Sequence, residues 1–280
     1  MAPGPVGTPV GRWREQIHWI PLHQPGGDAL LYARICRPQG DAPAPVAVIN
    51  HGAPPPGIGP TMMQPASCDT AAAQWFLSHG FLVVFAMRRG YGATGGTEVE
   101  NSGLCVDPDY DRAGLVGAED IAATVSYATS LPYARPDGAV VVGQSSGGWA
   151  TVAYDGVPHP RVAALISMAG GRGGWAGGVP RRNCRPDRLV QAAGRFGAVA
   201  TTPMLWIYAA NDSYFPPDLA AAMHAAFVRA GGRAELAQVG PYDGEGHRLF
   251  SGPGGPAIWG PIVARYLAER ESVRRVSSAP

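Results

Sequence analysis

The chain has 280 residues, which suits one large α/β domain or two small ones. A hydrophobic content of 46% and a mean hydropathy of -0.03 are typical of a globular protein with a sizeable core. The formal net charge is only +1, and all 22 basic residues are arginines, so no strong field favours nucleic acid or an anionic membrane as a partner. No run approaches the roughly 18 apolar residues that a membrane span requires.

The first residues and the cysteines add further expectations. Residues 1–11 are rich in Pro and Gly and have no apolar segment, so we expect a flexible tail without a signal peptide. The four cysteines form no C-x-x-C pair and have no histidine at metal-ligand spacing, so no metal site is expected. Cys105 and Cys184 lie in loop segments where a disulfide could join them, with free thiols as an equal alternative. Cys36 lies in a strand pattern and is expected to be a buried thiol.

Strand and helix patterns follow one another along most of the chain. Strands are expected where short β-branched or alternating runs occur, at residues 14–20, 29–37, 45–50, 81–86, 140–144, 162–168, 204–209 and 234–239. Helices are expected where apolar residues recur at helical spacing, at residues 69–79, 117–131, 148–155, 216–230 and 256–271. Residues 25–28, P-G-G-D, predict the turn between the first two strands.

This alternation predicts an α/β fold in a single domain, residues 12–272. We expect a mostly parallel sheet of about eight strands with helices on both faces. Residues 170–200 are expected to form an insertion or small cap over the site. Residues 273–280 are expected to be a second flexible tail.

Residues 140–149, V-V-V-G-Q-S-S-G-G-W, predict a short strand that turns abruptly into a helix. The turn has the G-x-S-x-G pattern of a nucleophile elbow, in which the serine hydroxyl projects above the sheet edge. Gly143 and Gly147 fit this turn because strand and helix cross there without room for side chains. Ser145 is therefore the candidate nucleophile, and an ordinary Gly/Ser turn is the alternative in so glycine-rich a chain.

A serine nucleophile needs a base within hydrogen-bond reach and a third group that orients the base. After such an elbow the chain order is serine, acid, histidine. Asp212 follows the seventh predicted strand and His247 follows the eighth, so we expect these two residues to complete a triad. The alternative for Asp212 is an N-cap of the next helix. Asp187 and Asp218 are weaker candidates, since they lie in the insertion and inside a helix.

An oxyanion that forms on the reacting carbonyl needs N–H donors fixed in advance. One candidate is the amide of Ser146, directly after the nucleophile. The other is the amide of Ala53 in the loop that follows the third strand, where Gly52 allows close approach. His51 is expected to hold this loop in shape rather than to move protons. A Pro-rich turn without such a role is the alternative for the segment.

Six short stretches together resemble the α/β-hydrolase superfamily, in particular the serine-nucleophile branch of the dienelactone-hydrolase-like esterases. They are V-I-N-H-G at 48–52, M-R-R-G-Y-G at 87–92, V-G-Q-S-S-G-G-W at 142–149, A-G-G-R-G-G at 169–174, N-D-S-Y-F-P at 211–216 and G-H-R-L-F at 246–250. The resemblance covers residues 12 to 270. It implies an acyl-enzyme mechanism with Ser145, Asp212 and His247 as the triad and the amides of Ala53 and Ser146 as the oxyanion hole.

The resemblance has one departure and one further implication. Dienelactone hydrolases proper carry a cysteine at the elbow, whereas this chain carries Ser145, so a dienelactone is not implied as the substrate. Proteins similar to this one often carry export signals, which would fit a disulfide between Cys105 and Cys184. We therefore favour an exported protein over a cytoplasmic one.

Two further groups of residues surround the expected site. Arg88 and Arg89 could recognise a substrate carboxylate, but we prefer the interpretation that an arginine binds a buried acid of the next helix, such as Asp120. Five aromatic residues in predicted strand-end loops are candidates for an apolar acyl or aryl pocket: Trp149, Trp175, Tyr214, Phe215 and Tyr242.

The sequence thus predicts a serine hydrolase that cleaves carboxylic esters of small molecules without a metal or cofactor. One alternative is an amide or peptide hydrolase that uses the same triad. Another is a non-catalytic binding protein on a hydrolase scaffold. The oligomeric state is not predicted.

Overall fold

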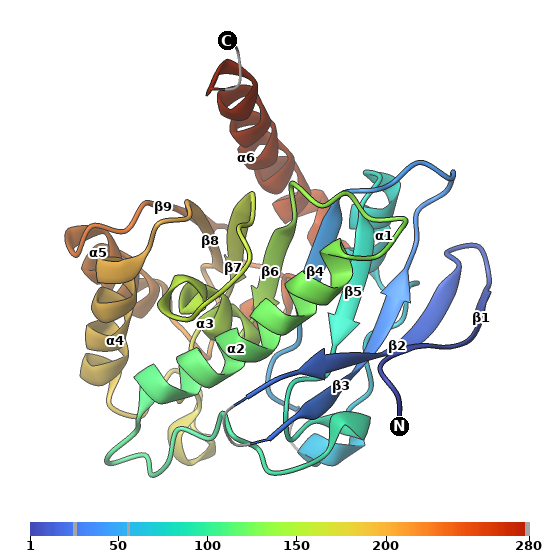
Figure 1. The fold of residues 1–280 in the computed structure, drawn as a ribbon. Coiled ribbons are helices and arrows are strands. Elements are labelled where there is room, and N and C mark those ends of the chain that lie inside the picture. Colours follow the sequence, from blue (N-terminus) through green and yellow to red (C-terminus); the bar gives the residue numbers. More distant parts are fainter. Residues whose placement is uncertain (25–26, 55–56, 278–280) are drawn as a thin grey trace.

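A computed structural model of the protein describes residues 1–24, 27–54 and 57–277. Within these residues one sheet of nine strands has the order β1-β2-β3-β5-β4-β6-β7-β8-β9 (Figure 1). The strands are β1 (Gly4–Val10), β2 (Glu15–Leu22), β3 (Ala29–Cys36), β4 (Val46–Asn50), β5 (Leu82–Ala86), β6 (Val140–Gln144), β7 (Ala164–Met168), β8 (Met204–Ala209) and β9 (Ala234–Val239). The α-helices are α1 (Ala71–Ser78), α2 (Tyr110–Thr129), α3 (Ser146–Val152), α4 (Pro186–Val199), α5 (Pro217–Arg229) and α6 (Gly255–Ser277).

The sheet is parallel from β5 to β9 and antiparallel from β1 to β5. In chain order, β4 is followed by β5, which lies on one side of β4, and then by β6, which lies on its other side. At such a change of direction the loops after neighbouring strands diverge and leave a crevice at the carboxyl ends of the strands. The nucleophile turn directly follows β6, so the topology places the candidate site at this crevice.

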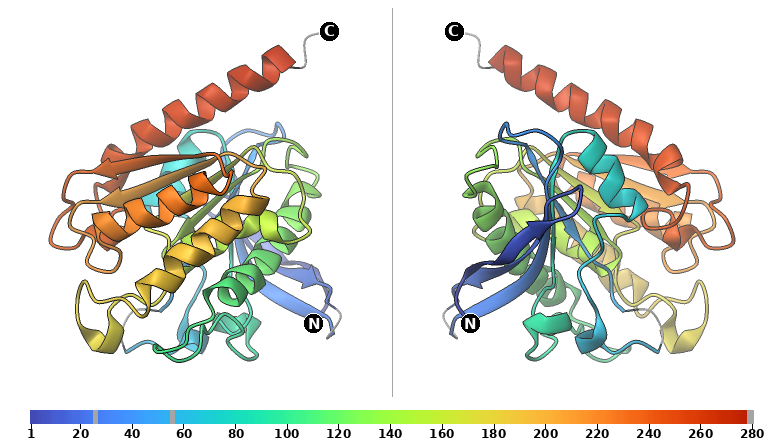
Figure 2. Two further views of the ribbon diagram at one scale, coloured as in Figure 1. Left: turned by 90° about the vertical axis from the view of Figure 1, so that its left-hand side faces the viewer. Right: turned by 90° about the vertical axis from the view of Figure 1, so that its right-hand side faces the viewer.

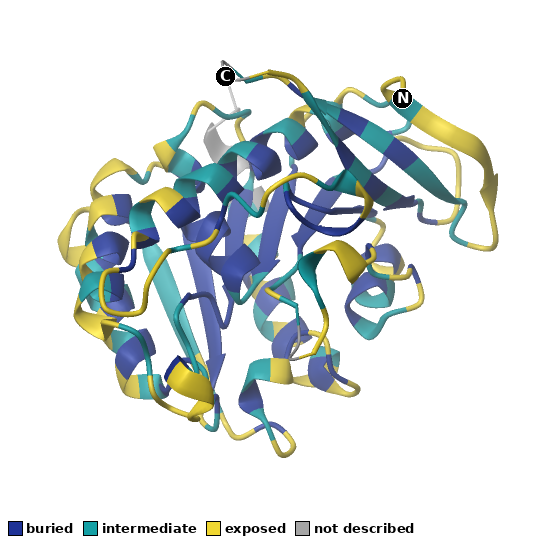
Figure 3. Ribbon diagram, turned by 90° about the horizontal axis from the view of Figure 1, so that it is seen from below, coloured by how far each residue is buried: buried dark blue, intermediate teal, exposed yellow. Residues whose placement is uncertain are grey.

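Both faces of the sheet are covered, which explains the continuous apolar runs in its central strands. In β4, Val46 and Val48 belong to one hydrophobic core, and Ala47 and Ile49 belong to the other. Helices α2, α3, α4 and α5 cover the first face, and α1 and α6 cover the second (Figure 2). Figure 3 shows the buried central strands between helices whose outer surfaces are exposed. The prediction of an α/β fold with a mostly parallel sheet is therefore confirmed.

The segment expected as an insertion or cap, residues 170–200, divides into two parts. Residues 170–185 follow β7 and form loops with one short 3-10 helix, Ala176–Gly178. Helix α4 instead joins the layer that covers the sheet, because Leu189, Ala192, Ala193 and Phe196 form an apolar stripe that is buried in the core. A Cβ atom on Gly197 would lie 2.1 Å from the carbonyl oxygen of Phe227, so α4 packs closely against α5.

Both ends of the chain differ from the sequence-based expectation. Residues 1–11, expected as a flexible tail, contain the edge strand β1, which pairs antiparallel with β2. Proline fits an edge strand because one side of such a strand has no neighbour that needs its N–H. Helix α6 continues to Ser277, past its expected end at Glu271, and extends away from the sheet (Figure 2). Residues 278–280 lie outside the described residues, as do residues 25–26 of the predicted turn and residues 55–56.

All four cysteines are paired. Cys105 and Cys184 form one disulfide, as the loop interpretation allows. Cys36, expected as a buried thiol, instead forms a disulfide with Cys68. Cys36 is the last residue of β3, and Cys68 lies in the loop that leads into α1, so this disulfide joins the sheet to the segment before α1.

None of the helices in the described ranges combines the length and the apolar character that crossing a membrane would require.

Candidate active site

Ser145 lies between the end of β6 and the start of α3 with φ of 55° and ψ of -120°. Any residue other than glycine is strained at these φ and ψ angles, at a cost on the order of 1–3 kcal/mol. The surroundings hold the conformation: the amide of Ser145 donates to the carbonyl of Met168 over 3.0 Å, and its carbonyl accepts from Trp149 and Gly171. The turn is therefore the strained strand-to-helix elbow that the sequence predicts.

The glycines on either side of the serine are required by close contacts. A Cβ atom on Gly143 would lie 2.1 Å from the carbonyl oxygen of Gly147. A Cβ atom on Gly147 would lie 2.4 Å from the carbonyl oxygen of His51. The elbow therefore packs backbone to backbone against its own helix and against the loop after β4, which confirms the prediction that side chains have no room there.

Asp212 and His247 come together from two loops. The Nδ1 atom of His247 lies 3.1 Å from Oδ2 of Asp212, whose side chain is fully buried. The other carboxylate oxygen accepts hydrogen bonds from the amides of Tyr214 and Phe215, over 2.8 and 2.9 Å. The N-cap of α5 is Pro216, so the alternative interpretation of Asp212 as that cap is not observed. Both oxygens are used, so the carboxylate is fixed in orientation.

The loop that carries His247 is attached to the elbow. The side-chain amide of Gln144 donates to the carbonyl of His247 over 2.9 Å, and Gln144 directly precedes Ser145. Gly246 allows the two loops to approach, since a Cβ atom there would lie 2.6 Å from the amide nitrogen of Asp212. His247 is thus tied to the acid through its imidazole and to the residue before the serine through its backbone carbonyl.

A residue that the sequence analysis does not single out also holds the histidine loop. Glu245 accepts hydrogen bonds from the amides of His247 and Ser213, over 2.9 and 3.1 Å, and a further one from the Ser213 hydroxyl. Burial alone would raise the pKa of Glu245, but these donors outweigh it and lower the pKa below its usual value. The nearest signal in the sequence is the position of Glu245 two residues before His247.

Aromatic rings from the loop that follows Asp212 pack against the imidazole. Tyr214 stacks on His247 with ring centroids 4.2 Å apart, and Trp175 stacks on Tyr214 at 4.7 Å. Phe215 lies 5.6 Å from the same imidazole and is almost fully buried. The Trp175 indole donates to the hydroxyl of Ser213 over 2.8 Å, which connects this stack to the Glu245 network. Three of the five aromatic pocket candidates therefore support the histidine.

The other two aromatic candidates are core residues, which corrects their expected position in a pocket. Trp149 is 1% exposed, and its indole donates to the carbonyl of Tyr110 over 2.8 Å. Tyr242 is 7% exposed, and its hydroxyl donates to the carbonyl of Pro253 over 2.6 Å. Both rings face partners inside the protein because α3 and the segment after β9 pack into the two cores.

The loop after β4 passes directly beside the nucleophile. A Cβ atom on Gly52 would lie 3.0 Å from Cβ and 3.7 Å from Oγ of Ser145. Ala53 is the next residue of this loop, and Ser146 is the first residue of α3, where amides have no partner within the helix. The two expected oxyanion donors therefore belong to segments that flank the serine.

A buried charge cluster lies beneath this loop. The Glu100 carboxylate binds the guanidinium groups of both Arg88 and Arg172. Burial alone would raise the pKa of Glu100, but the two positive charges hold it below its usual value. The amide of Arg88 also donates to Nε2 of His51 over 3.3 Å.

His51 holds the loop in shape. Its Nδ1 atom donates to the carbonyl of Gly52 over 2.8 Å, and its Nε2 atom accepts from Arg88. Burial, and then the positive charge of Arg88, lower the pKa of His51 to about 3. The imidazole is therefore neutral at ordinary pH and has both nitrogens engaged, which agrees with the expected role.

The preferred interpretation of the arginine pair is also confirmed. The Nε atom of Arg89 lies 2.7 Å from Oδ1 of Asp120, and the amide of Arg89 donates to the same carboxylate. Glu119 binds the guanidinium from a third side. Arg89 thus binds two acidic residues of α2, whereas Arg88 binds Glu100, which lies in the loop before α2. In the described part of the chain, no group of three or more His, Cys, Asp and Glu side chains has an arrangement that could hold a metal ion.

Comparisons with known proteins give matches at the level of structure. No protein-family profile matches the chain, and a search of curated proteins gives no match. A protein named as a dienelactone hydrolase, from Klebsiella pneumoniae, is 15% identical with a TM-score of 0.57, and the match covers 91% of this chain and 98% of that one. Acetyl xylan esterase 1 from a Thermoanaerobacterium species is 14% identical with a TM-score of 0.58, and the match covers 96% and 89% of the two chains.

A third match is to a longer protein. Puromycin hydrolase is 22% identical with a TM-score of 0.60, and the match covers 85% of this chain but 37% of that one. All three proteins are enzymes with the same arrangement of a mostly parallel sheet and helices. The mostly parallel sheet and the helices on both of its faces agree with this arrangement. The chain therefore has the α/β-hydrolase fold.

Proposed function

We propose that the protein is a serine hydrolase that cleaves carboxylic esters through an acyl-enzyme intermediate. The observation that carries this proposal is the hydrogen bond between Asp212 and His247 in a loop that Gln144 ties to the strained Ser145 turn. A nucleophile, a base and an orienting acid on one sheet edge are the arrangement that acyl transfer needs.

In the proposed reaction, His247 takes the hydroxyl proton of Ser145 at Nε2 while Oγ attacks the ester carbonyl. The negative charge that develops on the carbonyl oxygen is stabilised by the amides of Ser146 and Ala53. The C–O bond to the alcohol then breaks, and His247 returns the proton to the leaving oxygen. Water, activated by the same imidazole, releases the acid and restores the serine. Asp212 keeps Nδ1 protonated throughout.

The alternative of an amide or peptide substrate is supported by the likeness to puromycin hydrolase. That match covers 37% of the longer chain, so most of that enzyme has no counterpart in this domain. We therefore favour esters of small molecules. Faster turnover of aminoacyl anilides than of matched esters would reverse this preference.

We also propose that the protein works in an oxidising compartment, as an exported protein. Disulfides persist outside the cytosol and are rare in most cytosolic proteins. Both cysteine pairs of this chain are joined, and each links segments far apart in the sequence.

The test is the intact mass after treatment with a fluorophosphonate, together with turnover of p-nitrophenyl esters. The wild type should gain one adduct, and Ser145→Ala should gain none and lose at least about 1000-fold in kcat/KM while it stays folded. Ser126→Ala, which removes an exposed serine from α2, is the matched control and should behave as the wild type. A labelled or fully active Ser145→Ala protein would end the proposal.

A further inference from the structure

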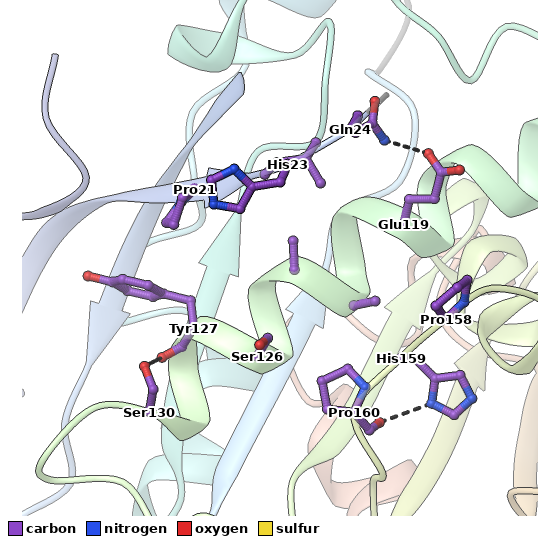
Figure 4. A pocket seen from close by; sticks show the side chains of 13 residues that line it. Pro21, His23, Gln24, Glu119, Ser126, Tyr127, Ser130, Pro158, His159 and Pro160 are labelled. Carbon is purple, nitrogen blue, oxygen red and sulfur yellow. Dashed lines mark hydrogen bonds between the residues drawn. The ribbon is translucent and has the colours of Figure 1, made fainter. Parts of the chain in front are cut away.

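A cavity of about 240 Å³ adjoins the elbow from the side of α1. It lies at the carboxyl ends of β4, β5 and β6, where the strand order changes direction, and ligands of open α/β sheets bind at such a place. A more open hollow of about 780 Å³ lies between β2, α2 and residues 158–160 (Figure 4). The hydrogen bond between Gln24 and Glu119 crosses one end of that hollow, which does not include the elbow.

The lining of the smaller cavity is mainly apolar. Its apolar part comes from strand ends, α1 and two loops, and includes Ile49, Met63, Ala66, Ala72, Phe85 and Phe250. Two polar side chains in the lining have partners elsewhere: the Asn50 side chain donates to the carbonyl of Val142, and the Thr70 hydroxyl caps α1. The cavity therefore favours an uncharged, apolar occupant.

Two lining residues connect the cavity to the nucleophile. Gln144 directly precedes Ser145, and Gly52 lies so close that a Cβ atom there would be 3.7 Å from the serine Oγ. A group bonded to a carbonyl carbon at Ser145 thus has the cavity beside it.

We propose that this cavity is the acyl subsite and that the substrate is an ester of a compact, apolar carboxylic acid. This inference rests on the proposed function. A cavity of about 150 Å³ holds benzene, so the present volume has room for an acyl group of about six to ten carbon atoms. Longer chains would have to leave a part of their apolar surface in water.

The order of the chemical steps assigns the cavity to the acyl group rather than to the alcohol. The alcohol leaves in the first half of the reaction, whereas the acyl group stays bonded to Ser145 until water attacks. A cavity bounded by buried strand ends holds the acyl group in place for the lifetime of the acyl-enzyme. A departing alcohol instead needs a path to solvent.

The outer wall of the cavity is held rigidly. Met63, Gln64, Ala66 and Thr70 line it from the segment before α1. This segment is attached to β3 by the disulfide between Cys36 and Cys68 and by a hydrogen bond of 2.7 Å from Arg34 to the carbonyl of Pro65. A fixed wall sets an upper limit to the acyl length, and selectivity among acyl groups should therefore be steep.

The experiment compares Met63 with its neighbour. Met63 lines the cavity, whereas Met62 is 67% exposed and does not. We would measure kcat/KM for p-nitrophenyl esters from acetate to palmitate with Met63→Trp and Met63→Ala, and use Met62→Trp and Met62→Ala as controls. Met63→Trp should lower the ratio of octanoate to acetate by about tenfold, and Met63→Ala should raise the relative rate of longer esters. The Met62 variants should keep the wild-type profile.

Other outcomes overturn the inference in distinguishable ways. If the serine is labelled and turns over esters but the Met63 variants keep the wild-type profile, the cavity is not the acyl subsite, and the proposed function stands. If the Met63 variants instead change the preference among alkyl acetates, the cavity holds the alcohol. If the serine is not labelled, the proposed function fails.

A binding measurement tests the cavity without turnover. Hexanamide should bind to Ser145→Ala, as followed by chemical shifts in NMR spectra, and the additional change Met63→Trp should abolish this binding while Met62→Trp preserves it. Equal binding by all three proteins, or binding by none, would overturn the assignment whatever the activity of the wild type.

Discussion

Asp212 uses both oxygens of its carboxylate, one for the histidine and one for two backbone amides. This division separates two tasks, because the amides fix the rotamer while the remaining oxygen selects the tautomer of His247. An asparagine at this position would keep the size of the side chain but could present an N–H where the imidazole needs an acceptor.

Asp212→Asn should therefore lower kcat by about 10³- to 10⁴-fold, as expected when the imidazole adopts the wrong tautomer. Steady-state kinetics with a p-nitrophenyl ester measures this loss, and circular dichroism checks the fold. Asp218→Asn is the control, since Asp218 is exposed in the first turn of α5. An Asp212→Asn enzyme within tenfold of the wild type would remove Asp212 from the mechanism.

At the scale of single residues, the sequence predicts those whose chemistry is tied to a position in a motif. Ser145, Gly143 and Gly147 follow from G-x-S-x-G, because few other backbones need this spacing. Glu245 does not follow, since its role depends on Ser213 coming near it from another loop. Trp149 is assigned to a pocket on its position near a strand end, but a side chain's direction follows from helix packing that the sequence does not display.

At the scale of elements, the two disulfides act on the loops above the sheet edge rather than on the sheet alone. The pair Cys36–Cys68 spans 32 residues and fixes the segment before α1, while Cys105–Cys184 spans 79 and joins the loop before α2 to the loop before α4. A hydrogen bond from the Tyr110 hydroxyl, at the start of α2, to the carbonyl of Cys184 also joins these two segments.

Replacement of Cys36 and Cys68 together by serine should lower the free energy of unfolding by about 3–4 kcal/mol, from the loop entropy regained in the unfolded chain. Denaturant unfolding measures this change. The same double replacement at Cys105 and Cys184 should cost about 4–5 kcal/mol because its loop is longer. Only the first variant should also broaden the acyl-length profile, and an unchanged profile would mean that the disulfide does not fix the cavity wall.

Element boundaries show where sequence patterns mislead. Helix α2 is expected from residue 117 but begins at Tyr110, capped by the Asp109 side chain. Gly114 and Gly117 weaken the helical pattern over these first turns. Both have a packing reason, because a Cβ atom on Gly114 would lie 2.8 Å from the Phe196 ring, and one on Gly117 would lie 2.8 Å from Ala150. Such contacts arise only in the assembled fold, so local propensity underestimates the helix.

At the scale of the whole molecule, the fold is the most predictable property. Strands whose five residues are all buried, such as β4 and β5, need cover on both faces, and the helices that connect such strands supply it. The edges are less predictable, since β1 is exposed along most of its length and has no apolar alternation to reveal it. β1 pairs with the backbone of β2, and the Gln16 side chain of β2 adds a hydrogen bond to the carbonyl of Gly7.

Two histidines with lowered pKa values, His18 and His51, should make the stability of the whole protein depend on pH. Burial lowers the pKa of His18 to about 4 and, with the charge of Arg88, that of His51 to about 3, against an ordinary value of 6.5. Between pH 6.5 and the lowered pKa values, the two histidines bind protons in the unfolded chain but not in the folded protein. The free energy of unfolding therefore falls as the pH is lowered from 6.5.

The melting temperature should therefore decrease from about pH 7 to about pH 4. His18→Phe removes one of the two histidines and keeps a ring against Tyr127. The melting temperature of this variant should therefore fall less steeply with pH over this range. His79→Phe, at an exposed histidine after α1, should leave the slope as it is. If the melting temperatures of the wild type and His18→Phe fall equally with pH, His18 does not contribute to the pH dependence of stability.

The strained conformation of Ser145 has a consequence for protein engineering. Glycine adopts a positive φ without penalty, so the unmutated protein holds its nucleophile at a cost in stability on the order of 1–3 kcal/mol. A library sorted only by heat resistance would thus enrich glycine at this position and discard the hydroxyl. Selection for durability and selection for turnover point in opposite directions at residue 145, and a screen for improved variants has to score both.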